Sequence, residues 1–254
     1  MPEEFVRSLA RGLEVITAFD ADHPALTLSE VAGRTGLGRA TARRFLLTLV
    51  ELGYVRGDGR RFSLTPQVLR LGTAYLSGLD LPGAAQPHLE RLSAEVGEST
   101  SAAVLDGTDI VYVARVATRR IMSVGITVGT RFPAHATSMG RVLLAGAVDG
   151  MDDAQRRALL GEDPLPAPTA RTLTRVDDVL AELDRVAAQG WALVDGELEV
   201  GLRSLAVPLH DATGAVVAAL NVSSTSSAAT LRGTLGPLRE TAAAVDADLR
   251  LVTR

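Results

Sequence analysis

Apolar residues recur at intervals of three and four near the start of the chain, which predicts an amphipathic helix. They are Val6, Leu9, Ala10, Leu13, Ile16 and the pair Ala18 and Phe19. After a break at residues 22–24, Thr27 stands three positions before Glu30, which is the spacing of a capping box. A second, short helix is therefore expected to begin at Thr27 and to end at Gly36.

A third helix is expected over residues 39–52, because one of its faces is apolar and the other is polar. The apolar face consists of Ala42, Phe45, Leu46, Leu49 and Val50. The polar face consists of Arg39, Thr41, Arg43, Arg44 and Thr48. Residues 54–56 and 62–64 are predicted to form a hairpin whose tip carries Arg60 and Arg61. Two helices joined by a short turn and followed by a basic hairpin indicate a winged helix-turn-helix, so these polar residues are predicted to contact DNA.

A further helix is expected after Thr65, with Pro66 at its first position. Its apolar residues are Val68, Leu71, Tyr75, Leu76 and Leu79. This face could pack on its own domain, but we favour a linker that also dimerises, because a two-fold protein matches a two-fold operator. The predicted domains are a winged helix-turn-helix over 1–66, a linker helix over 67–80 and a second domain over 81–254.

The pattern changes after residue 81, where alternating runs predict strands separated by helical segments. Strands are expected over 99–105, 110–116, 121–126, 191–195, 204–210 and 215–222. Helices are expected through 88–96 and over 137–147, 153–160, 176–189 and 231–252. Strands that are first consecutive and then separated by helices indicate an α+β domain with one mixed or antiparallel sheet.

Composition adds a modest charge contrast between the two predicted domains. Residues 1–78 hold ten arginines against eight acids, whereas residues 79–254 hold sixteen against twenty-two. A basic front and an acidic remainder suit a nucleic-acid module joined to a metabolite-sensing module. No apolar run approaches the ~20 residues of a membrane span, so the expectation is a cytoplasmic protein without a membrane partner.

The residue inventory argues against most enzyme classes. The chain has no cysteine and no lysine, and its four histidines are scattered, so no metal site, cofactor or Schiff base is expected. A serine hydrolase that uses His135 or His210 remains an alternative, although no Gly-x-Ser-x-Gly elbow is present. A ligand-independent architectural DNA-binding protein is a second alternative. Thermal melting with candidate aromatic acids would separate that protein from a sensor.

Four segments in order carry a resemblance to the IclR family of bacterial regulators. They are residues 8–13, 28–52, 132–145 (FPAHATSMGRVLLA) and 197–208 (ELEVGLRSLAVP). Within that family, Thr137 to Arg141 and Leu220 to Ser223 resemble the subgroup that controls breakdown of protocatechuate, para-hydroxybenzoate and β-ketoadipate. The resemblance implies a GAF-like C-terminal effector domain and a dimer or tetramer. It also implies operator DNA in a promoter whose occupancy or polymerase contact changes with a small organic acid, aromatic or dicarboxylic.

The resemblance also implies a set of effector-binding residues. They are Ser138, Met139, Asp195, Leu202, Ser204, Asn221 and Ser223. The family often has a second acid at the position of Val194 and a cysteine at that of Ser204, so the preferred ligand is left open.

Simpler structural roles remain for several of these polar residues. Ser138 could instead cap a helix, and Asp195 could serve only its turn. For Arg203 an ion pair with Glu197 or Glu199 is the expected role, and His135 is expected to be a hydrogen-bonded structural residue.

Overall fold

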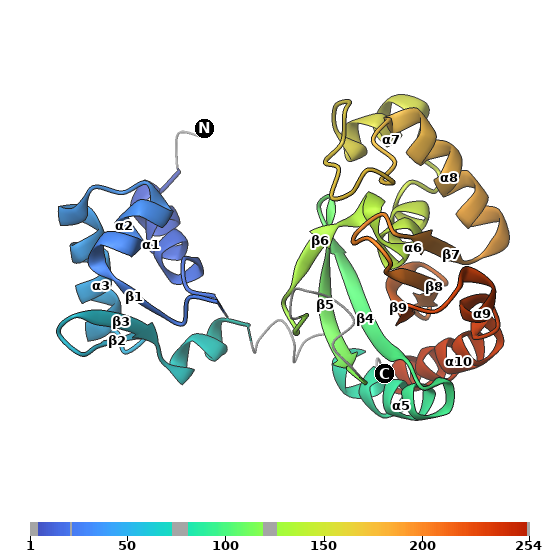
Figure 1. Cartoon of the computed structure of the whole chain (residues 1–254), viewed down its shortest axis with the longest axis horizontal. Coiled ribbons are helices and arrows are strands. Elements are labelled where there is room, and N and C mark those ends of the chain that lie inside the picture. Colours follow the sequence, from blue (N-terminus) through green and yellow to red (C-terminus); the bar gives the residue numbers. More distant parts are fainter. Residues whose placement is uncertain (1–4, 21, 73–80, 119–125, 253–254) are drawn as a thin grey trace. The chain divides into compact units, whose positions relative to one another are not determined.

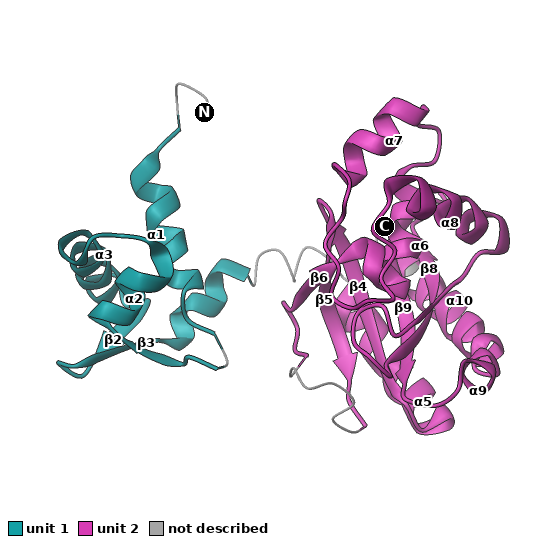
Figure 2. Cartoon of the chain, turned by 45° about the horizontal axis from the view of Figure 1, so that its top comes forward, with its two compact units in different colours: residues 1–78 teal, residues 79–254 magenta. Residues whose placement is uncertain are grey.

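The computed structural model describes residues 5–20, 22–72, 81–118 and 126–252, with side chains described as far as residue 250. The chain divides into two compact units, Met1–Gly78 and Leu79–Arg254 (Figure 2). Each unit has a hydrophobic core of its own. The predicted linker helix over 67–80 is described only at its start, where a 3-10 turn, η1 (Pro66–Val68), leads into a helix that begins at Leu69. Its Tyr75, Leu76 and Leu79 lie outside the described residues.

The N-terminal unit packs three helices on a small antiparallel sheet (Figure 1). Its elements are α1 (Arg7–Thr17), β1 (Ala25–Thr27), α2 (Leu28–Thr35), α3 (Arg39–Glu51), β2 (Val55–Gly57) and β3 (Arg61–Leu64). The strand order is β1-β3-β2. This is the winged helix-turn-helix that the sequence predicts, with one strand added, because β1 is too short to show an alternating pattern.

Local signals set the ends of α2 as predicted. Thr27 accepts the backbone N–H of Glu30, and the Glu30 carboxylate accepts the N–H of Thr27, which completes the capping box. Gly36 ends the helix in the left-handed region, at φ 65°. The turn from Gly36 to Gly38 then sets the start of α3.

In the first helix, the residues that are buried differ in part from the apolar stripe that the sequence predicts. Its buried residue is Val15, and Ala18 and Phe19 just after it are also buried. The residues that begin the predicted stripe are at least half exposed: Val6 (59%), Leu9 (64%) and Leu13 (50%). On α3, Val50 is likewise 37% exposed rather than buried. The helix α1 therefore carries a second apolar face that the described residues of its own unit do not cover.

The C-terminal unit is built on one six-stranded sheet in the order β6-β5-β4-β9-β8-β7, in which every neighbouring pair is antiparallel. Its strands are β4 (Ser99–Asp106), β5 (Asp109–Val116), β6 (Arg131–Pro133), β7 (Ala192–Asp195), β8 (Arg203–His210) and β9 (Val216–Ser224). Its helices are α5 (Leu81–Val96), η2 (Ala134–Ala136), α6 (Ser138–Ala147), α7 (Asp153–Leu160), α8 (Val176–Gln189), α9 (Ala228–Arg232) and α10 (Leu235–Val252).

Helices cover the two faces of this sheet in separate layers (Figure 1). The helices α5 and α10 pack on one face, around Leu89, Leu205 and Leu220. The helices α6 and α8 lie on the other face, around Leu144, Leu183 and small strand residues such as Ala206. The fold class is α+β, as predicted, and the small residues let α6 approach the sheet closely.

The remaining differences concern short or interrupted elements. The strand β6 was not predicted, and the predicted helix over 231–252 is two helices that are separated by Gly233 and Thr234. The predicted strand over 121–126 lies outside the described residues, apart from Ile126. Among the helices of the described part of the chain, none is long and apolar enough to cross a membrane.

Candidate DNA-binding and effector sites

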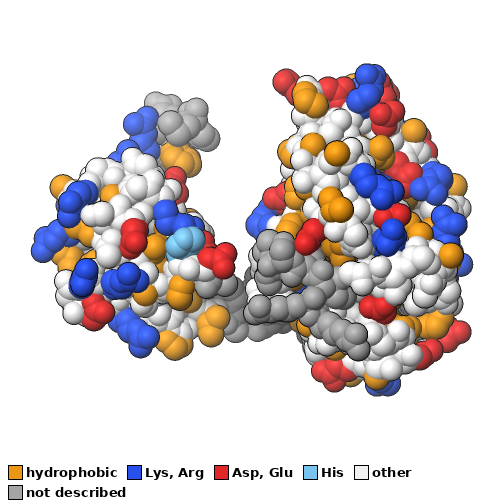
Figure 3. Space-filling view, viewed as in Figure 1, with side chains coloured by type: hydrophobic (Ala, Val, Ile, Leu, Met, Phe, Trp, Pro, Cys, Tyr) orange, Lys and Arg blue, Asp and Glu red, His pale blue; other side chains and the backbone are white. Residues whose placement is uncertain are grey.

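The predicted DNA-contacting residues lie together on α3 and the β2–β3 hairpin. Arg39, Arg43, Arg44 and Thr48 are exposed along α3, and Thr41 is half-buried at its start. Arg60 and Arg61 are exposed at the hairpin tip and at the beginning of β3. Figure 3 shows blue basic side chains over this part of the N-terminal unit. The helix and the hairpin thus both carry exposed guanidinium groups.

These arginines are exposed, and the guanidinium group of one of them, Arg61, donates to the carbonyl oxygen of Ala25 at 3.3 Å. Within the residues that the structure describes, none of Arg39, Arg43, Arg44, Arg60 and Arg61 forms an ion pair. The hairpin is fixed instead by the Asp58 carboxylate, which accepts the backbone N–H groups of Arg60 and Arg61 at 2.9 and 2.7 Å. These hydrogen bonds lower the pKa of Asp58 below its usual value. A phosphate backbone would supply the missing negative charge.

In the C-terminal unit, the face of the sheet that carries α6 has a polar part at one end. We call it the polar cluster, and it consists of Ser99, Ser101, Arg115, Ser138, Ser204, Asn221 and Ser223. Strand pairing sets Ser101 opposite both Arg115 and Asn221, and it sets Ser223 opposite both Ser99 and Ser204. Residues directly opposite in an antiparallel pair project from the same face. Four strands and the first residue of α6 therefore converge on the polar cluster.

Hydrogen bonds join the polar cluster across its elements. Ser138 Oγ donates to Ser204 Oγ at 2.8 Å, and the Asn221 side-chain N–H donates to Ser223 Oγ at 2.9 Å. All four residues are at most 9% exposed. The helix cap is Thr137, whose hydroxyl accepts the N–H of Gly140, so Ser138 is not the cap of α6. Four of the predicted effector residues thus lie together, and α6 is hydrogen-bonded to the sheet through one of them.

Three members of the polar cluster were missed by the sequence analysis. Ser99, Ser101 and Arg115 lie on β4 and β5, far in sequence from the segments that carry the family resemblance. The sequence does contain a signal for Arg115, because it is an arginine in an otherwise apolar strand run. Its importance depends on strand order, which the local pattern does not give.

The structure places Asp195 outside the polar cluster. It stands opposite Arg203 at the start of β8, and the two side chains form an ion pair at 3.1 Å. Arg203 also donates to the carbonyl oxygen of Ser226 at 3.1 Å. The prediction that Arg203 pairs with Glu197 or Glu199 is therefore wrong: Arg203 pairs with Asp195, and Glu197 pairs with Arg141.

The two apolar effector residues are both buried. Met139 follows Ser138 on α6 and is 1% exposed within the core beneath that helix. Leu202 is 7% exposed and immediately precedes β8, and its carbonyl oxygen accepts the N–H of Gly196. Their role as apolar walls of an effector site stays a prediction.

A buried charged network lies beside the polar cluster and ties α6 to the 195–202 loop. Arg141 is 2% exposed, donates to a Glu197 carboxylate oxygen and lies 3.6 Å from Glu182 on α8. Its Nε also donates to the carbonyl oxygen of His135. His135 itself pairs through Nε2 with the carbonyl oxygen of Pro166 at 2.8 Å, the structural role that the sequence predicted. Burial lowers the pKa of His135.

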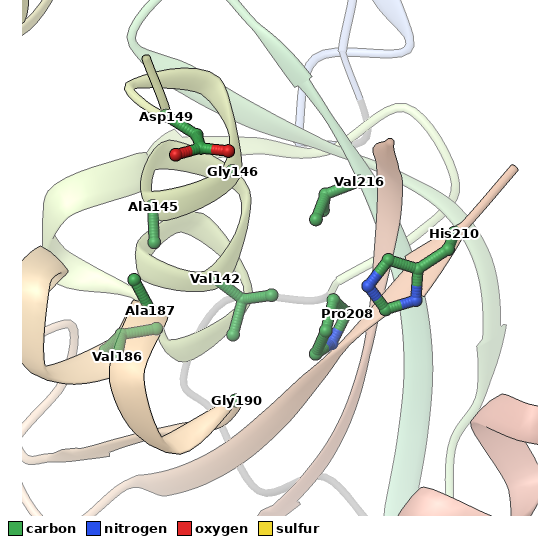
Figure 4. A pocket seen from close by; sticks show the side chains of 10 residues that line it. All are labelled: Val142, Ala145, Gly146, Asp149, Val186, Ala187, Gly190, Pro208, His210 and Val216. Carbon is green, nitrogen blue, oxygen red and sulfur yellow. The ribbon is translucent and has the colours of Figure 1, made fainter. Parts of the chain in front are cut away.

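A separate cavity of about 310 Å³ opens at the other end of α6 (Figure 4). Apolar residues from α6, α8, β8 and β9 form most of its wall, and Asp149 and His210 are its charged or titratable side chains. None of the predicted effector residues lines it. Gly146 belongs to this wall, and a Cβ there would lie 2.6 Å from Cβ of Val216. This cavity is the alternative place in which a small ligand could bind.

The alternative of catalysis gains no support from the described residues. Over that part of the chain no hydrogen bond joins a serine hydroxyl to a histidine ring, and His210 pairs with Asp246. The same residues contain no group of three or more histidine or acidic side chains that could hold a metal ion.

Comparison with known proteins assigns both units to one family. The family model described as "IclR helix-turn-helix domain" matches residues 8–59, and the one described as "Bacterial transcriptional regulator IclR C-terminal" matches residues 73–247. The "Pca regulon regulatory protein" of Pseudomonas putida is 51% identical over 221 residues, which cover 87% of this chain and 75% of that protein.

Two further relatives carry names that concern aromatic acids. The "p-hydroxybenzoate hydroxylase transcriptional activator" of Acinetobacter baylyi is 38% identical, over 86% of this chain and 81% of that protein. The crystal structure of an IclR homologue from Microbacterium hydrocarbonoxydans, complexed with 4-hydroxybenzoate, is 30% identical with a TM-score of 0.83, over 95% and 98% of the two chains. The chain is a DNA-binding transcriptional regulator that belongs to the IclR family.

Proposed function

We propose that this chain controls a bacterial catabolic operon in response to a small hydroxylated aromatic acid that binds in the polar cluster. The observation that carries the proposal is the buried hydrogen bond between Ser138 and Ser204, which joins α6 to the sheet within a group of hydroxyl and amide side chains. A few convergent polar groups beside apolar walls are typical of a small-molecule site. The ligand class and the kind of operon are proposed from the similarity to the Pca regulator, to the p-hydroxybenzoate hydroxylase activator and to the homologue complexed with 4-hydroxybenzoate.

The DNA-binding part of the proposal rests on the unpaired arginines of α3 and the hairpin. In a winged helix-turn-helix the second helix of the motif enters the major groove, where a guanidinium group reads guanine through two parallel hydrogen bonds. Arg39, Arg43, Arg44, Thr41 and Thr48 are the proposed contacts of α3 with the duplex. Arg60 and Arg61 are proposed to contact phosphates beside the groove.

Substitution of Arg43 by alanine is expected to weaken binding to the DNA upstream of the gene by about 10- to 100-fold, because one groove contact is worth about 1–3 kcal/mol. Ser138→Ala is expected to retain DNA affinity and to reduce the change in affinity that 4-hydroxybenzoate produces. Fluorescence anisotropy with the labelled upstream fragment, with and without 4-hydroxybenzoate, measures both effects.

The matched control for Arg43 is Arg185→Ala, which removes an exposed arginine of the C-terminal unit. This variant should bind DNA as the wild type does. The proposal fails if the wild-type protein shows no salt-sensitive association with its upstream DNA in either condition. It also fails if Arg43→Ala leaves DNA affinity unchanged while Ser138→Ala abolishes it.

We further propose that the active form contains at least two copies of the chain, in contact through the exposed apolar face of α1. Val6, Leu9 and Leu13 recur at three and four positions on this face and are at least half exposed. An apolar helix face of this kind suits a second copy of the same helix. Two copies would match a two-fold operator, whose half-sites lie one helical turn apart.

Replacing Leu9 by arginine is expected to shift the protein toward smaller species and to weaken operator binding by at least tenfold, because it places a charge in the proposed interface. Analytical ultracentrifugation over a concentration series gives the first quantity, and anisotropy gives the second. Val200→Arg is the control, because Val200 is 80% exposed in the C-terminal unit. An unchanged sedimentation profile for Leu9→Arg would contradict the proposed interface.

A further inference from the structure

Arg115 is a charged member of the polar cluster whose charge is not matched by a carboxylate. It lies on β5, half-buried, and its Nη1 donates to Ser101 Oγ at 3.1 Å. Its Nε is buried and has no hydrogen-bond partner. No ion pair joins it to an acidic residue of the described ranges. The more deeply buried Arg141, by contrast, is held by Glu197 and Glu182.

This arrangement is costly in the absence of a ligand. A guanidinium that leaves water must recover its lost solvation from hydrogen bonds or from a counter-charge. Burial lowers the pKa of Arg115, and the aromatic ring of Tyr112, with its centroid 6.0 Å from the guanidinium carbon, offers only a cation–π contact. An anion beside the guanidinium would supply both the counter-charge and the hydrogen-bond acceptor.

A second unsatisfied atom lies two strands away on the same face of the sheet. Asn221 is 2% exposed, and its side-chain oxygen has no hydrogen-bond partner, while its N–H group donates to Ser223. Ser101 on β4 stands between Arg115 and Asn221 in the register. Adjacent strands are about 4.8 Å apart, so the two backbone positions lie about 10 Å apart. An unused donor and an unused acceptor thus lie at opposite sides of one serine.

We propose that Arg115 binds the carboxylate of the effector through its guanidinium and that the Asn221 oxygen accepts a hydrogen bond from a hydroxyl group at the effector's far end. This assignment rests on the proposed function and adds the orientation of the ligand, with its carboxylate toward Arg115 and its hydroxyl group toward Asn221. Arginine is suited to the role, because its planar donors match the two oxygens of a carboxylate. A ring that carries a carboxylate and a distant hydroxyl satisfies both unsatisfied atoms at once.

The test is isothermal titration of the full chain with 4-hydroxybenzoate, its uncharged analogue 4-hydroxybenzamide, and 4-methoxybenzoate, which lacks the hydroxyl donor. The wild type should bind the acid about 10- to 100-fold more tightly than the amide, because hydrogen bonds to charged groups contribute about 1.5–3 kcal/mol. It should also bind the methoxy analogue at least tenfold more weakly. In Arg115→Met the acid should lose this advantage and bind no better than the amide.

Two further variants keep the test decisive. Asn221→Leu should lose the preference for hydroxy over methoxy while retaining the preference for acid over amide. Ala187→Trp narrows the separate cavity at the other end of α6, because Ala187 is an exposed residue of its wall, and it should leave all three affinities unchanged. A loss of acid binding in Ala187→Trp would move the ligand to that cavity and overturn the assignment.

The unfolding temperature of Arg115→Met distinguishes a ligand-binding arginine from one with a purely structural role. Because Arg115 has no counter-charge in the free protein, Arg115→Met should unfold at the same temperature as the wild type or higher. A structural role predicts a lower unfolding temperature instead. If no aromatic acid binds the wild type, the proposed function itself fails. If the acid binds the wild type and Arg115→Met equally, only the role of Arg115 is refuted.

Discussion

Gly140→Ala is expected to destabilise the C-terminal unit by about 3 kcal/mol or more, which is at the upper end for a single added methyl group. A Cβ at this position would lie 2.1 Å from the carbonyl oxygen of Ala134 and 2.3 Å from its Cα. Both atoms belong to the backbone of η2, so no side-chain rotation relieves the clash. Urea unfolding followed by the fluorescence of Trp191, the only tryptophan of the chain, reports on this unit.

The control for this prediction is Gly83→Ala on α5, another glycine in a helix of the same unit. A Cβ at Gly83 meets nothing within 4 Å, so alanine should be neutral or should stabilise the unit by up to about 1 kcal/mol through its helix propensity. Equal midpoints for Gly140→Ala and the wild type would show that η2 and α6 are not packed as described. DNA binding by the N-terminal unit serves to check that Gly140→Ala does not disturb the rest of the chain.

Arg141→Met is the second substitution with a large expected effect, a loss of about 3–5 kcal/mol in the free energy of unfolding of the C-terminal unit. The reason is that Glu197 would keep its negative charge in a buried place without the cation that neutralises it, whereas Glu182 keeps its ion pair with Arg185. The same substitution also removes the hydrogen bond from Arg141 to the carbonyl oxygen of His135. The measurement is again urea unfolding monitored through Trp191.

The double variant Arg141→Met with Glu197→Gln separates the charge effect from the loss of packing. Glutamine keeps an oxygen that can accept the N–H of Leu173, as the Glu197 carboxylate does, but it carries no charge. The double variant should therefore be more stable than Arg141→Met alone, which is non-additive behaviour for residues in contact. If the two effects simply add, the network does not act through its charges. Arg157→Met, which removes exposed ion pairs with Asp153 and Asp177, should leave the midpoint nearly unchanged.

Elements whose signals are local could be predicted from the sequence. The capping box of Thr27 and Glu30 begins α2, and the turn at residues 106–109, where Gly107 has φ 62°, joins β4 to β5. Both signals lie within four residues, so the chain folds there as the local pattern indicates. The strands β1 and β6 were missed because each has three residues and is defined by a distant partner, as Leu26 is by Phe62.

In the candidate site, too, some features have local sequence signals and others depend on residues that are distant in sequence. Ser138, Ser204, Asn221 and Ser223 could be named from segments that resemble a family, but their position beside Ser101 and Arg115 depends on the pairing of β4 with β9. That pairing joins residues more than a hundred positions apart, such as Ser101 and Asn221, and no local pattern contains it. Without it Arg115 is one arginine in an apolar strand. The partner of Arg203 was mistaken for a related reason, because the path of the 195–202 loop, with left-handed Gly196 and Gly201, decides which acid faces it.

The sheet order has a consequence for when the protein becomes responsive. Three residues of the polar cluster come from β4 and β5 and one comes from α6, whereas the remaining three come from β8 and β9, which leave the ribosome about a hundred residues after β4 and β5. Chain synthesis proceeds at about 5–20 residues per second, so several seconds separate the two pairs of strands. The winged helix-turn-helix is complete well before either pair. A nascent chain can thus form its DNA-binding unit before the proposed effector site exists, and the proposed regulation by the ligand begins only after β9 has been added to the sheet.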